Sequence, residues 1–391
     1  MSSTRRGRRA AALLVLLVLA LLAASCGGDD GGDADGTTTT STTSSSTTST
    51  TTTTEPVGPV MPLTGLSAGE ADPEAGAVLV KIGNNNESSR PQFGIHEADI
   101  VYEEFVENAK TRFAAVFHSQ LPDILGPIRS GRTSDFDLVH GLGVPGFASS
   151  GGNPTVLGAL RNASNAGDLV DVGWVWRESY YHRIADRAAP YNLVLSTVDN
   201  EVRGENPPTP QFVYGSIGTL GQTIGGVSVK YPPAFGRESV HLWDADLAAW
   251  VRVQDGTLHT VIDGADDDGQ GGTEVEIAPT NVVLASVTYG VSPADPSSPE
   301  AESFGMGPAQ VFTQGREIQG TWSRTTDNPI WDLRTVSGDP IPLAPGPTWV
   351  LLVADADSRF ATGDISTFSR ADASAMLAEA REAYAESTAA G

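Results

Sequence analysis

The stretch ADIVYEEFVENAKTRFAAVFHS, residues 98–119, decides the fold of the first half of the chain. Residues 98–106 and 111–119 are two runs rich in β-branched and aromatic side chains, which favour strands. Between them, residues 108–110 (Asn-Ala-Lys) are short enough for a tight turn, and asparagine tolerates the backbone conformation that such a turn needs. The stretch therefore predicts two neighbouring strands joined by a tight turn.

A further strand and two helices are expected around these two strands. VLVKI, residues 78–82, predicts a strand that precedes them. After them, Thr133 or Ser134 can cap a helix whose first turn carries acidic residues, as the helix dipole favours. Pro154 fits the first turn of a second helix, NPTVLGALRNA.

The pattern changes beyond the proline-rich segment GENPPTP, residues 204–210. Short strands separated by turn signals follow, including a hairpin turn at residues 314–315, and they predict antiparallel β structure. The Ala/Glu-rich segment from Ser369 predicts either an amphipathic helix or a fraying tail. We therefore expect an α+β fold, with a layered α/β N-terminal part (β-β-α sandwich-like) followed by a mostly antiparallel β C-terminal part.

The beginning of the chain carries an export signal. Arginines precede residues 10–24, an unbroken run of Ala, Leu and Val that is shorter than the about 20 residues of a membrane-spanning helix. LLAASC then ends at Cys26, the only cysteine, in an arrangement that resembles a bacterial lipobox. An ordinary secretory signal with a chance cysteine is the alternative. A single cysteine excludes an internal disulfide and a cysteine-based zinc cluster.

Composition divides the chain into five segments. Residues 37–54 contain only Ser and Thr and cannot bury a core, so they predict a disordered stalk. The expected segments are a signal peptide (1–25), a Ser/Thr-rich stalk (26–60), an α/β domain (61–205), a β-rich domain (206–355) and a tail with a helix (356–391).

The charge of the chain limits its partners. A formal net charge of −24 opposes binding to nucleic acid and to anionic lipid surfaces. The six histidines are scattered without a zinc-binding spacing, and no phosphate-binding loop motif occurs. We therefore predict neither a metal nor a cofactor.

GPIRSGRTS, residues 126–134, is the candidate site for an anion. It places Arg129 and Arg132 in a Gly-rich turn ahead of a predicted helix N-terminus, and guanidinium groups bind carboxylate or phosphate through two hydrogen bonds. Other polar residues of this half of the chain could converge with them on one cleft, namely Arg112, Arg177, Arg183, Arg187 and Asn192. The alternative is that the two arginines form ion pairs with nearby acids, for which the candidates are Glu103, Glu104, Asp135 and Asp137.

Paired carboxylates raise a second possibility, an enzyme. Glu103 and Glu104 are neighbours on a strand and therefore point to opposite faces, which argues against a glycosidase pair made from these two alone. One of them could still act as a general acid together with Asp135 or Asp137 from the next loop.

The order of several sequence blocks supports a resemblance to a known family. PLTGL (residues 62–66), RPQFGIHEADIVYEEF (90–105), GPIRSGRTSDFDL (126–138) and APYNL (189–193) are followed by further blocks up to residue 353. In this order the chain resembles the YerB-like family of bacterial lipoproteins, a two-part domain of unknown function. The resemblance implies an envelope location but no established activity or cofactor. The family usually has histidine where this chain has Tyr191, so no mechanism using a histidine at that place is expected.

The leading hypothesis is a non-enzymatic lipoprotein, anchored by a lipid on Cys26 to the outer face of the cell membrane. It would bind an anionic cell-wall polymer or an envelope protein through the arginines. The competing hypothesis is a cell-wall hydrolase or transferase that uses Glu103, Glu104 or Asp135 with arginine clamps.

Overall fold

The computed structural model describes residues 58–231, 237–360 and 362–389. They belong to one compact unit, Glu55–Gly391. The predicted signal peptide, Cys26 and nearly all of the predicted stalk lie outside the described residues. No helix among the described residues is long and apolar enough to cross a membrane.

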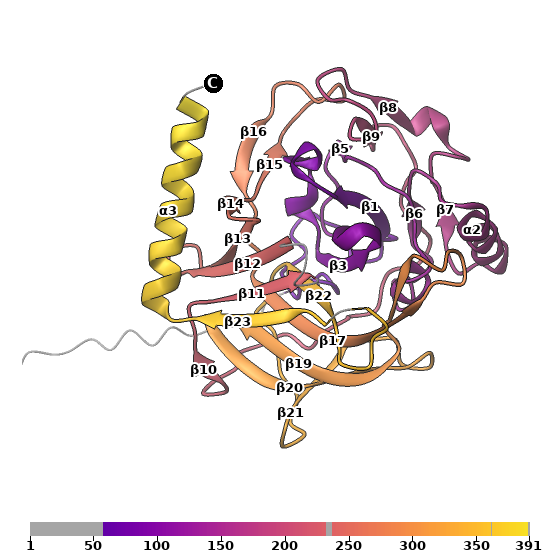
Figure 1. The fold of residues 1–391 in the computed structure, drawn as a ribbon. Coiled ribbons are helices and arrows are strands. Elements are labelled where there is room, and N and C mark those ends of the chain that lie inside the picture. The colour runs from indigo at the N-terminus through magenta and orange to yellow at the C-terminus, as the bar shows by residue number, and fades with distance from the viewer. Residues whose placement is uncertain (1–57, 232–236, 361, 390–391) are drawn as a thin grey trace, which may run out of the picture. The chain divides into compact units, whose positions relative to one another are not determined.

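One large sheet contains strands from both halves of the chain (Figure 1). Within the described residues it has 12 strands, in the order β10-β20-β19-β17-β22-β3-β4-β1-β6-β7, with β18 paired to β17 and β21 to β20. Its strands are β1 (Val78–Asn84), β3 (Ile100–Val106), β4 (Lys110–Phe117), β6 (Gly146–Ala148), β7 (Val170–Asp171), β10 (Gln222–Thr223), β17 (Asn281–Val291), β18 (Pro299–Glu302), β19 (Gly305–Thr313), β20 (Arg316–Arg324), β21 (Asp332–Thr335) and β22 (Thr348–Ala354).

The join between the two halves lies at the centre of this sheet. Strand β22 runs parallel to β3, with Thr348 opposite Ile100, and parallel to β17 on its other side. Strands β3 and β4 form the antiparallel pair expected for residues 98–119. Every residue of β1, β3 and β22 is buried, which is typical of strands covered on both faces.

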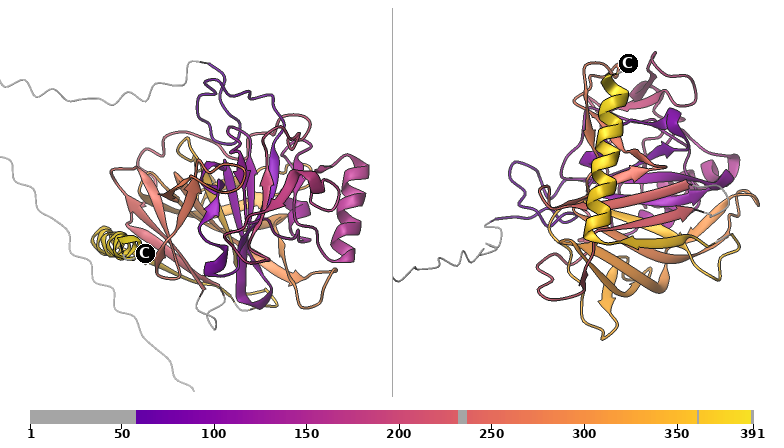
Figure 2. Two further views of the ribbon diagram at one scale, coloured as in Figure 1. Left: turned by 90° about the horizontal axis from the view of Figure 1, so that it is seen from above. Right: turned by 60° about the vertical axis from the view of Figure 1, so that its left-hand side comes forward.

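Three smaller sheets surround the large one (Figures 1 and 2). Their orders are β14-β13-β12-β11-β23, β16-β15-β2 and β5-β9-β8. Their strands are β2 (Gln92–Phe93), β5 (Ile124–Leu125), β8 (Tyr181–Arg183), β9 (Leu193–Ser196), β11 (Gly226–Tyr231), β12 (Arg237–Asp244), β13 (Ala249–Gln254), β14 (Thr257–Leu258), β15 (Thr260–Asp263), β16 (Thr273–Glu276) and β23 (Asp364–Phe368).

Few helices accompany these sheets. The described α-helices are α1 (Asp135–Leu138), α2 (Pro154–Ala166) and α3 (Arg370–Ala389), and the 3-10 turns are η1 (Glu87–Ser89), η2 (Ile95–Glu97), η3 (Glu107–Ala109) and η4 (Glu178–Tyr180). The predicted α+β class is therefore confirmed, with a mixed sheet first and mainly antiparallel strands afterwards.

The three α-helices match their sequence signals to different degrees. Asn153 caps α2 by accepting hydrogen bonds from two backbone N–H groups, and proline occupies the first turn as predicted. Helix α3 is a helix and not a fraying tail, and it packs Leu377 and two alanines against the five-stranded sheet. Helix α1 has only 4 residues, and Ser134 precedes it without a side-chain capping bond. The Ser134 hydroxyl instead accepts a hydrogen bond from the Ala301 N–H at 3.0 Å.

Both predicted turns are present. Gln314 and Gly315, with φ of 49° and 66°, connect β19 and β20. Asn108, with φ of 62°, lies in the turn between β3 and β4. Asparagine and glycine adopt this left-handed backbone conformation at lower cost than other residues.

Candidate functional site

The segment GPIRSGRT forms a turn along strand β1, and we call residues 126–133 the arginine turn. The Gly83 N–H of β1 donates to the Pro127 carbonyl at 2.9 Å, and the Arg129 N–H donates to the Lys81 carbonyl at 2.8 Å. A Cβ atom at Gly83 would lie 2.9 Å from Cγ of Arg129. The backbone of β1 therefore holds the turn, and a residue without a side chain lets Arg129 cross the strand.

Three buried ionisable side chains lie under this turn. Lys81 of β1 bonds Asp135 of α1 at 2.6 Å and also pairs with Glu104 of β3, and all three side chains are buried. Burial raises the pKa of Asp135 to about 6, against the opposing effect of the Lys81 ammonium, and the charge of Glu104 raises it further. One ammonium group cannot compensate two buried carboxylates fully.

Arg112 of β4 is buried beside the turn. Its Nη1 donates to the Ser130 carbonyl at 2.9 Å, whereas its Nε is buried and has no hydrogen-bond partner among the described residues. Burial lowers the pKa of Arg112 to about 9, and the charges of Arg132 and Arg129 lower it as well. Arg112, Arg129 and Arg132 are therefore close enough to repel one another, and we call them the guanidinium cluster.

Arg129 has an aromatic partner instead of an acidic one. Its guanidinium carbon lies 5.6 Å from the ring centroid of Tyr191, whose hydroxyl accepts a hydrogen bond from Asn86 at 3.0 Å. Within the part of the chain that the structure describes, Arg129 forms no ion pair, and its buried Nη1 has no partner. Burial lowers the pKa of Arg129. The predicted pairing of Arg129 with nearby acids is therefore wrong for the described residues.

Arg132 does form an ion pair, but with an acid that was not predicted. Its Nη2 lies 2.7 Å from Glu107, and its Nε is buried without a partner among the described atoms. Burial raises the pKa of Glu107, but hydrogen bonds from Arg132 and Ser298 lower it, to about 2. The Arg132 backbone N–H donates to the Asp135 carboxylate at 2.6 Å. The expected anion site at a helix N-terminus is therefore not formed, since α1 is one turn long and this N–H is already used.

Two of the predicted ligand residues make their contacts elsewhere. Arg187 donates to the Pro91 carbonyl at 2.6 Å and stacks on Phe93 at 4.8 Å. Asn192 accepts from Arg183 at 2.7 Å and donates to the Ile184 carbonyl. Neither shares a contact with the guanidinium cluster.

The two neighbouring glutamates have separate roles. Glu104 pairs with Lys81, while Glu103, on the other face of β3, accepts from Arg252 at 3.0 Å and from Ser239 at 3.2 Å. Both carboxylates are fully buried. Each one is therefore a buried counter-ion.

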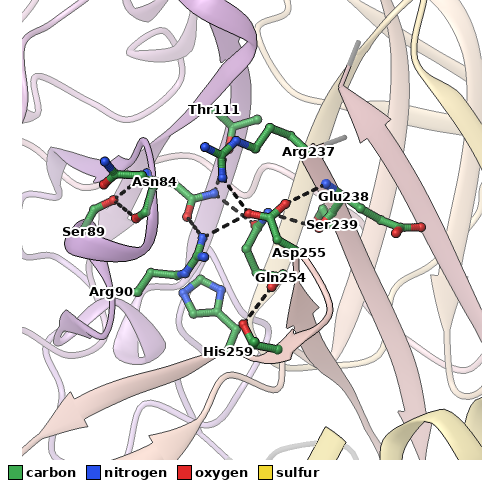
Figure 3. A network of polar contacts seen from close by, with 12 residues as sticks. Asn84, Ser89, Arg90, Thr111, Arg237, Glu238, Ser239, Gln254, Asp255 and His259 are labelled. Carbon is green, nitrogen blue, oxygen red and sulfur yellow. Dashed lines mark hydrogen bonds and ion pairs between the residues drawn. The ribbon is translucent and has the colours of Figure 1, made fainter. Parts of the chain in front are cut away.

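The Glu103 side of the sheet continues into a polar network that joins the two halves (Figure 3). Asn84 donates to Gln254 at 3.1 Å, and Arg90 lies 3.6 Å from Asp255, which also pairs with Arg237 at 2.8 Å. These contacts connect β1 and the segment after η1 with the hairpin β12–β13.

A cavity adjoins the guanidinium cluster on the side of Arg132. It measures about 210 Å³, and residues from both halves of the chain line it. Its polar lining consists of Glu107, Ser130, Arg132, Asn153, Ser292, Asp295 and Ser298. The cluster thus has a concave and polar approach.

One group of possible metal ligands occurs among the described residues. Ligand atoms of His96, Glu97 and Asp263 lie within 4.8 Å of one another, and His96 contacts Asp263 at 3.3 Å. Burial raises the pKa of Glu97, and Asp263 and Asp123 raise it further. These residues share no contact with the arginine turn.

Sequence reasoning missed three residues of the site, Lys81, Glu107 and Tyr191. Lys81 had a detectable signal, because a lysine in the middle of an apolar strand must find a buried counter-ion. Tyr191 and Glu107 are brought to the arginines only by long-range packing.

Two segments of the chain match one protein family. Residues 63–207 match the description "Protein of unknown function (DUF3048) N-terminal domain", and residues 227–350 match "Protein of unknown function (DUF3048) C-terminal domain". Together they cover more than half of the chain.

The chain is similar in sequence and in structure to a protein of Bacillus subtilis. The protein of strain 168 named "Putative lipoprotein YerB" is 27% identical over 311 residues, which is 76% of this chain and 87% of that protein. The crystal structure of YerB from Bacillus subtilis gives a TM-score of 0.60 at 24% identity, and covers 79% of this chain and 99% of that chain. At this identity the structural likeness establishes a shared fold.

Proposed function

The chain belongs to the DUF3048 family, a family of unknown function, and from this premise we propose that it is a lipid-anchored extracytoplasmic binding protein. It recognises an anionic group, carboxylate or phosphate, of a cell-envelope ligand, and the guanidinium cluster is the binding site. A single observation carries the proposal: three neighbouring arginines each have a buried nitrogen without a hydrogen-bond partner in the described residues, namely Arg112 Nε, Arg129 Nη1 and Arg132 Nε.

Unpartnered donors of this kind have a physical cost. A buried polar group without a partner costs about 1–3 kcal/mol, and more when it is charged. Arg112 adds to this cost because the two other guanidinium charges already lower its pKa. An anion accepts several charge-assisted hydrogen bonds and relieves the mutual repulsion at the same time. Anion binding is therefore the role that these three side chains support best.

The local charge favours recognition at short range. The whole chain carries −24, so its overall field repels a polyanion. At the arginine turn the only acid paired with the guanidinium cluster in the described structure is Glu107. Binding should therefore depend on direct contacts with the cluster and weaken little as salt screens the overall field.

The enzyme hypothesis has one observation in its favour and one against it. The raised pKa of Asp135, about 6, suits a general acid. Asp135 is however fully buried and bonded to Lys81, and Glu103 and Glu104 are equally buried. A group that performs acid catalysis must come within hydrogen-bond reach of its substrate. Arg132 lines the cavity of about 210 Å³, whereas these three acids do not, so the binding role is favoured.

Lipid anchoring completes the proposal. It rests on Cys26 at the end of the signal-like segment and on the name of the Bacillus subtilis relative. A Cys26→Ser variant should leave the membrane fraction for the soluble one. Retention of the variant in the membrane would count against the anchor.

The anion site is tested with a soluble chain of residues 27–391, which keeps every residue that the structure describes. Arg129→Met removes the guanidinium group and keeps an unbranched stem. It should weaken binding to sugar-free peptidoglycan stem peptides with free carboxylates, or to phosphorylated wall polymers, by roughly 10–100-fold in isothermal titration calorimetry.

Arg187→Met is the matched control. Arg187 is also half-buried, also stacks on an aromatic ring, and lies outside the guanidinium cluster. Equal affinity of the folded Arg129→Met variant, the control and the wild type would refute the anion site.

A further inference from the structure

Trp176 differs from the other tryptophans of the chain in its exposure. Trp250, Trp322, Trp331 and Trp349 are buried in the core, whereas Trp176 is 49% exposed. Its neighbour Val175 is 48% exposed. A large aromatic side chain gains much free energy from burial, so a half-exposed indole next to another apolar residue indicates a contact surface.

The indole is held in place from one side. The guanidinium carbon of Arg161 on α2 lies 5.0 Å from the Trp176 ring centroid. The backbone N–H groups of Trp176 and Arg177 both donate to the Gly173 carbonyl at 3.0 Å, which closes a tight turn. A half-exposed ring backed by a cation and carried by a closed turn is ordered before any ligand arrives.

Trp176 lies in an open depression of about 350 Å³ that is lined by α2, β7 and the loop after β7. Helix α2 and strand β7 lie at an edge of the molecule in Figure 1. The side chains that line the depression are Arg161, Ser164, Asn165, Asp171, Trp176 and Arg177. Three of them, Arg161, Ser164 and Asn165, lie three and four residues apart on one face of α2.

We propose that this depression binds a pyranose ring that carries a carboxylate. The C–H face of a sugar ring packs on an indole face, while amide, carboxylate and hydroxyl groups around the ring bind its hydroxyl groups. Asn165, Asp171 and Ser164 supply these groups. Two arginines against one aspartate make the lining locally cationic in a chain of charge −24, and this favours an acidic sugar over a neutral one.

The depression and the arginine turn are attached to one loop. The Trp174 N–H donates to the Ser149 carbonyl at 2.9 Å, and the Ser150 N–H donates to the Arg129 carbonyl at 3.0 Å. The sugar site is nevertheless separate from the anion site, because the two share no lining residue. It goes beyond the proposed function and does not depend on it.

The test measures binding of two defined saccharides to residues 27–391 by isothermal titration calorimetry and saturation-transfer NMR. The acidic probe is the disaccharide of N-acetylglucosamine and N-acetylmuramic acid with its lactyl carboxylate free, and the neutral probe is tri-N-acetylchitotriose. The wild type should bind the acidic probe more tightly, and its axial C–H protons should show the strongest saturation transfer.

Variants test separately the stacking of the sugar on Trp176 and the recognition of its carboxylate. Trp176→Ala should weaken binding of the acidic probe about tenfold, and Trp176→Phe should restore part of it. Arg177→Gln should lower the affinity for the acidic probe and leave that for the neutral probe unchanged. Met306→Ala is the control, because Met306 is 81% exposed and does not line the depression.

The inference is overturned if the wild type binds neither saccharide, or if folded Trp176→Ala binds as tightly as the wild type. Arg129→Met should keep its affinity for the disaccharide, so that failure of the anion site and failure of the sugar site are distinguished.

Discussion

At the scale of single residues, this protein contains charges that are unusually deep. Lys81, Glu104 and Asp135 have no exposure, and one ammonium serves two carboxylates. Taking charges out of water costs several kcal/mol per ion, and only close pairing offsets this cost. Lys81, Glu104 and Asp135 therefore stabilise the arginine turn only while all three are present.

Removing the ammonium should destabilise the fold strongly. Lys81→Met leaves two buried carboxylates without a cation, and we expect the free energy of unfolding to fall by about 3–5 kcal/mol in chemical denaturation. Lys230→Met is the control. The Lys230 side chain is 47% exposed, and the variant loses only the ion pair with Glu238, whose atoms lie 3.9 Å apart. Similar losses in both variants would show that Lys81 is not a buried counter-ion.

The pH dependence of stability should show the protonation of Asp135. Because its pKa is about 6 in the folded protein and 3.8 in the reference state, the folded state binds the proton more tightly. The resulting stabilisation is fully present below about pH 4 and is lost as the pH rises through about 6. Between these values the wild type should lose roughly 3 kcal/mol relative to Asp135→Asn, as measured by urea unfolding at several pH values. Parallel curves for the two proteins would contradict this assignment.

At the scale of elements, the arginine turn depends on β1. The turn is bonded to the backbone of β1 at Lys81 and Gly83, and the absence of a side chain at Gly83 leaves room for Arg129. The alternating side chains of β3 place Glu103 and Glu104 on opposite faces, where each meets a different cation. The short-range geometry of the two strands thus positions the arginine turn and the two glutamates.

A methyl group at Gly83 tests this dependence. In Gly83→Ala the new Cβ would lie 2.9 Å from Cγ of Arg129 and 3.6 Å from the Pro127 carbonyl, so the arginine side chain must move. We expect anion affinity to fall about tenfold while the unfolding free energy changes by less than about 1.5 kcal/mol. Calorimetry with the anionic wall fragments measures the change in affinity, and a denaturation curve measures the change in unfolding free energy. Unchanged affinity would mean that the position of Arg129 does not matter for binding.

At the scale of the whole molecule, the two family segments share one sheet. Strand β22 of the second half lies between β3 of the first half and β17. The Asn84–Gln254 and Arg90–Asp255 contacts join the same halves outside that sheet (Figure 3). The predicted domains 61–205 and 206–355 are therefore expected to unfold together.

This expectation is open to a direct test. Residues 58–205 expressed alone would expose the edge of β3 and the apolar faces that the second half covers. We expect this fragment to show no cooperative thermal transition, and residues 58–391 to show a single one by calorimetry and circular dichroism. A cooperative transition of the isolated fragment would show that the first domain is autonomous.

Local sequence signals determined much of the architecture. The strand pair of residues 98–119, the capped helix α2, the hairpin at Gln314–Gly315 and the α+β class follow from periodicity, capping and turn residues, because these act between neighbours in the chain. The order of the sequence blocks likewise indicated the family.

Only the tertiary structure decided which charges meet. Arg132 pairs with Glu107 instead of an acid that is closer in the sequence, and Arg129 stacks on Tyr191. Arg187 and Asn192 make their contacts outside the guanidinium cluster. Side-chain partners across a fold are chosen by packing and by the cost of burying charge, which depend on residues far apart in sequence. For the same reason, the sequence alone named the arginine turn as a candidate site but could not show that Arg129 stacks on Tyr191 or that Trp176 stays half-exposed.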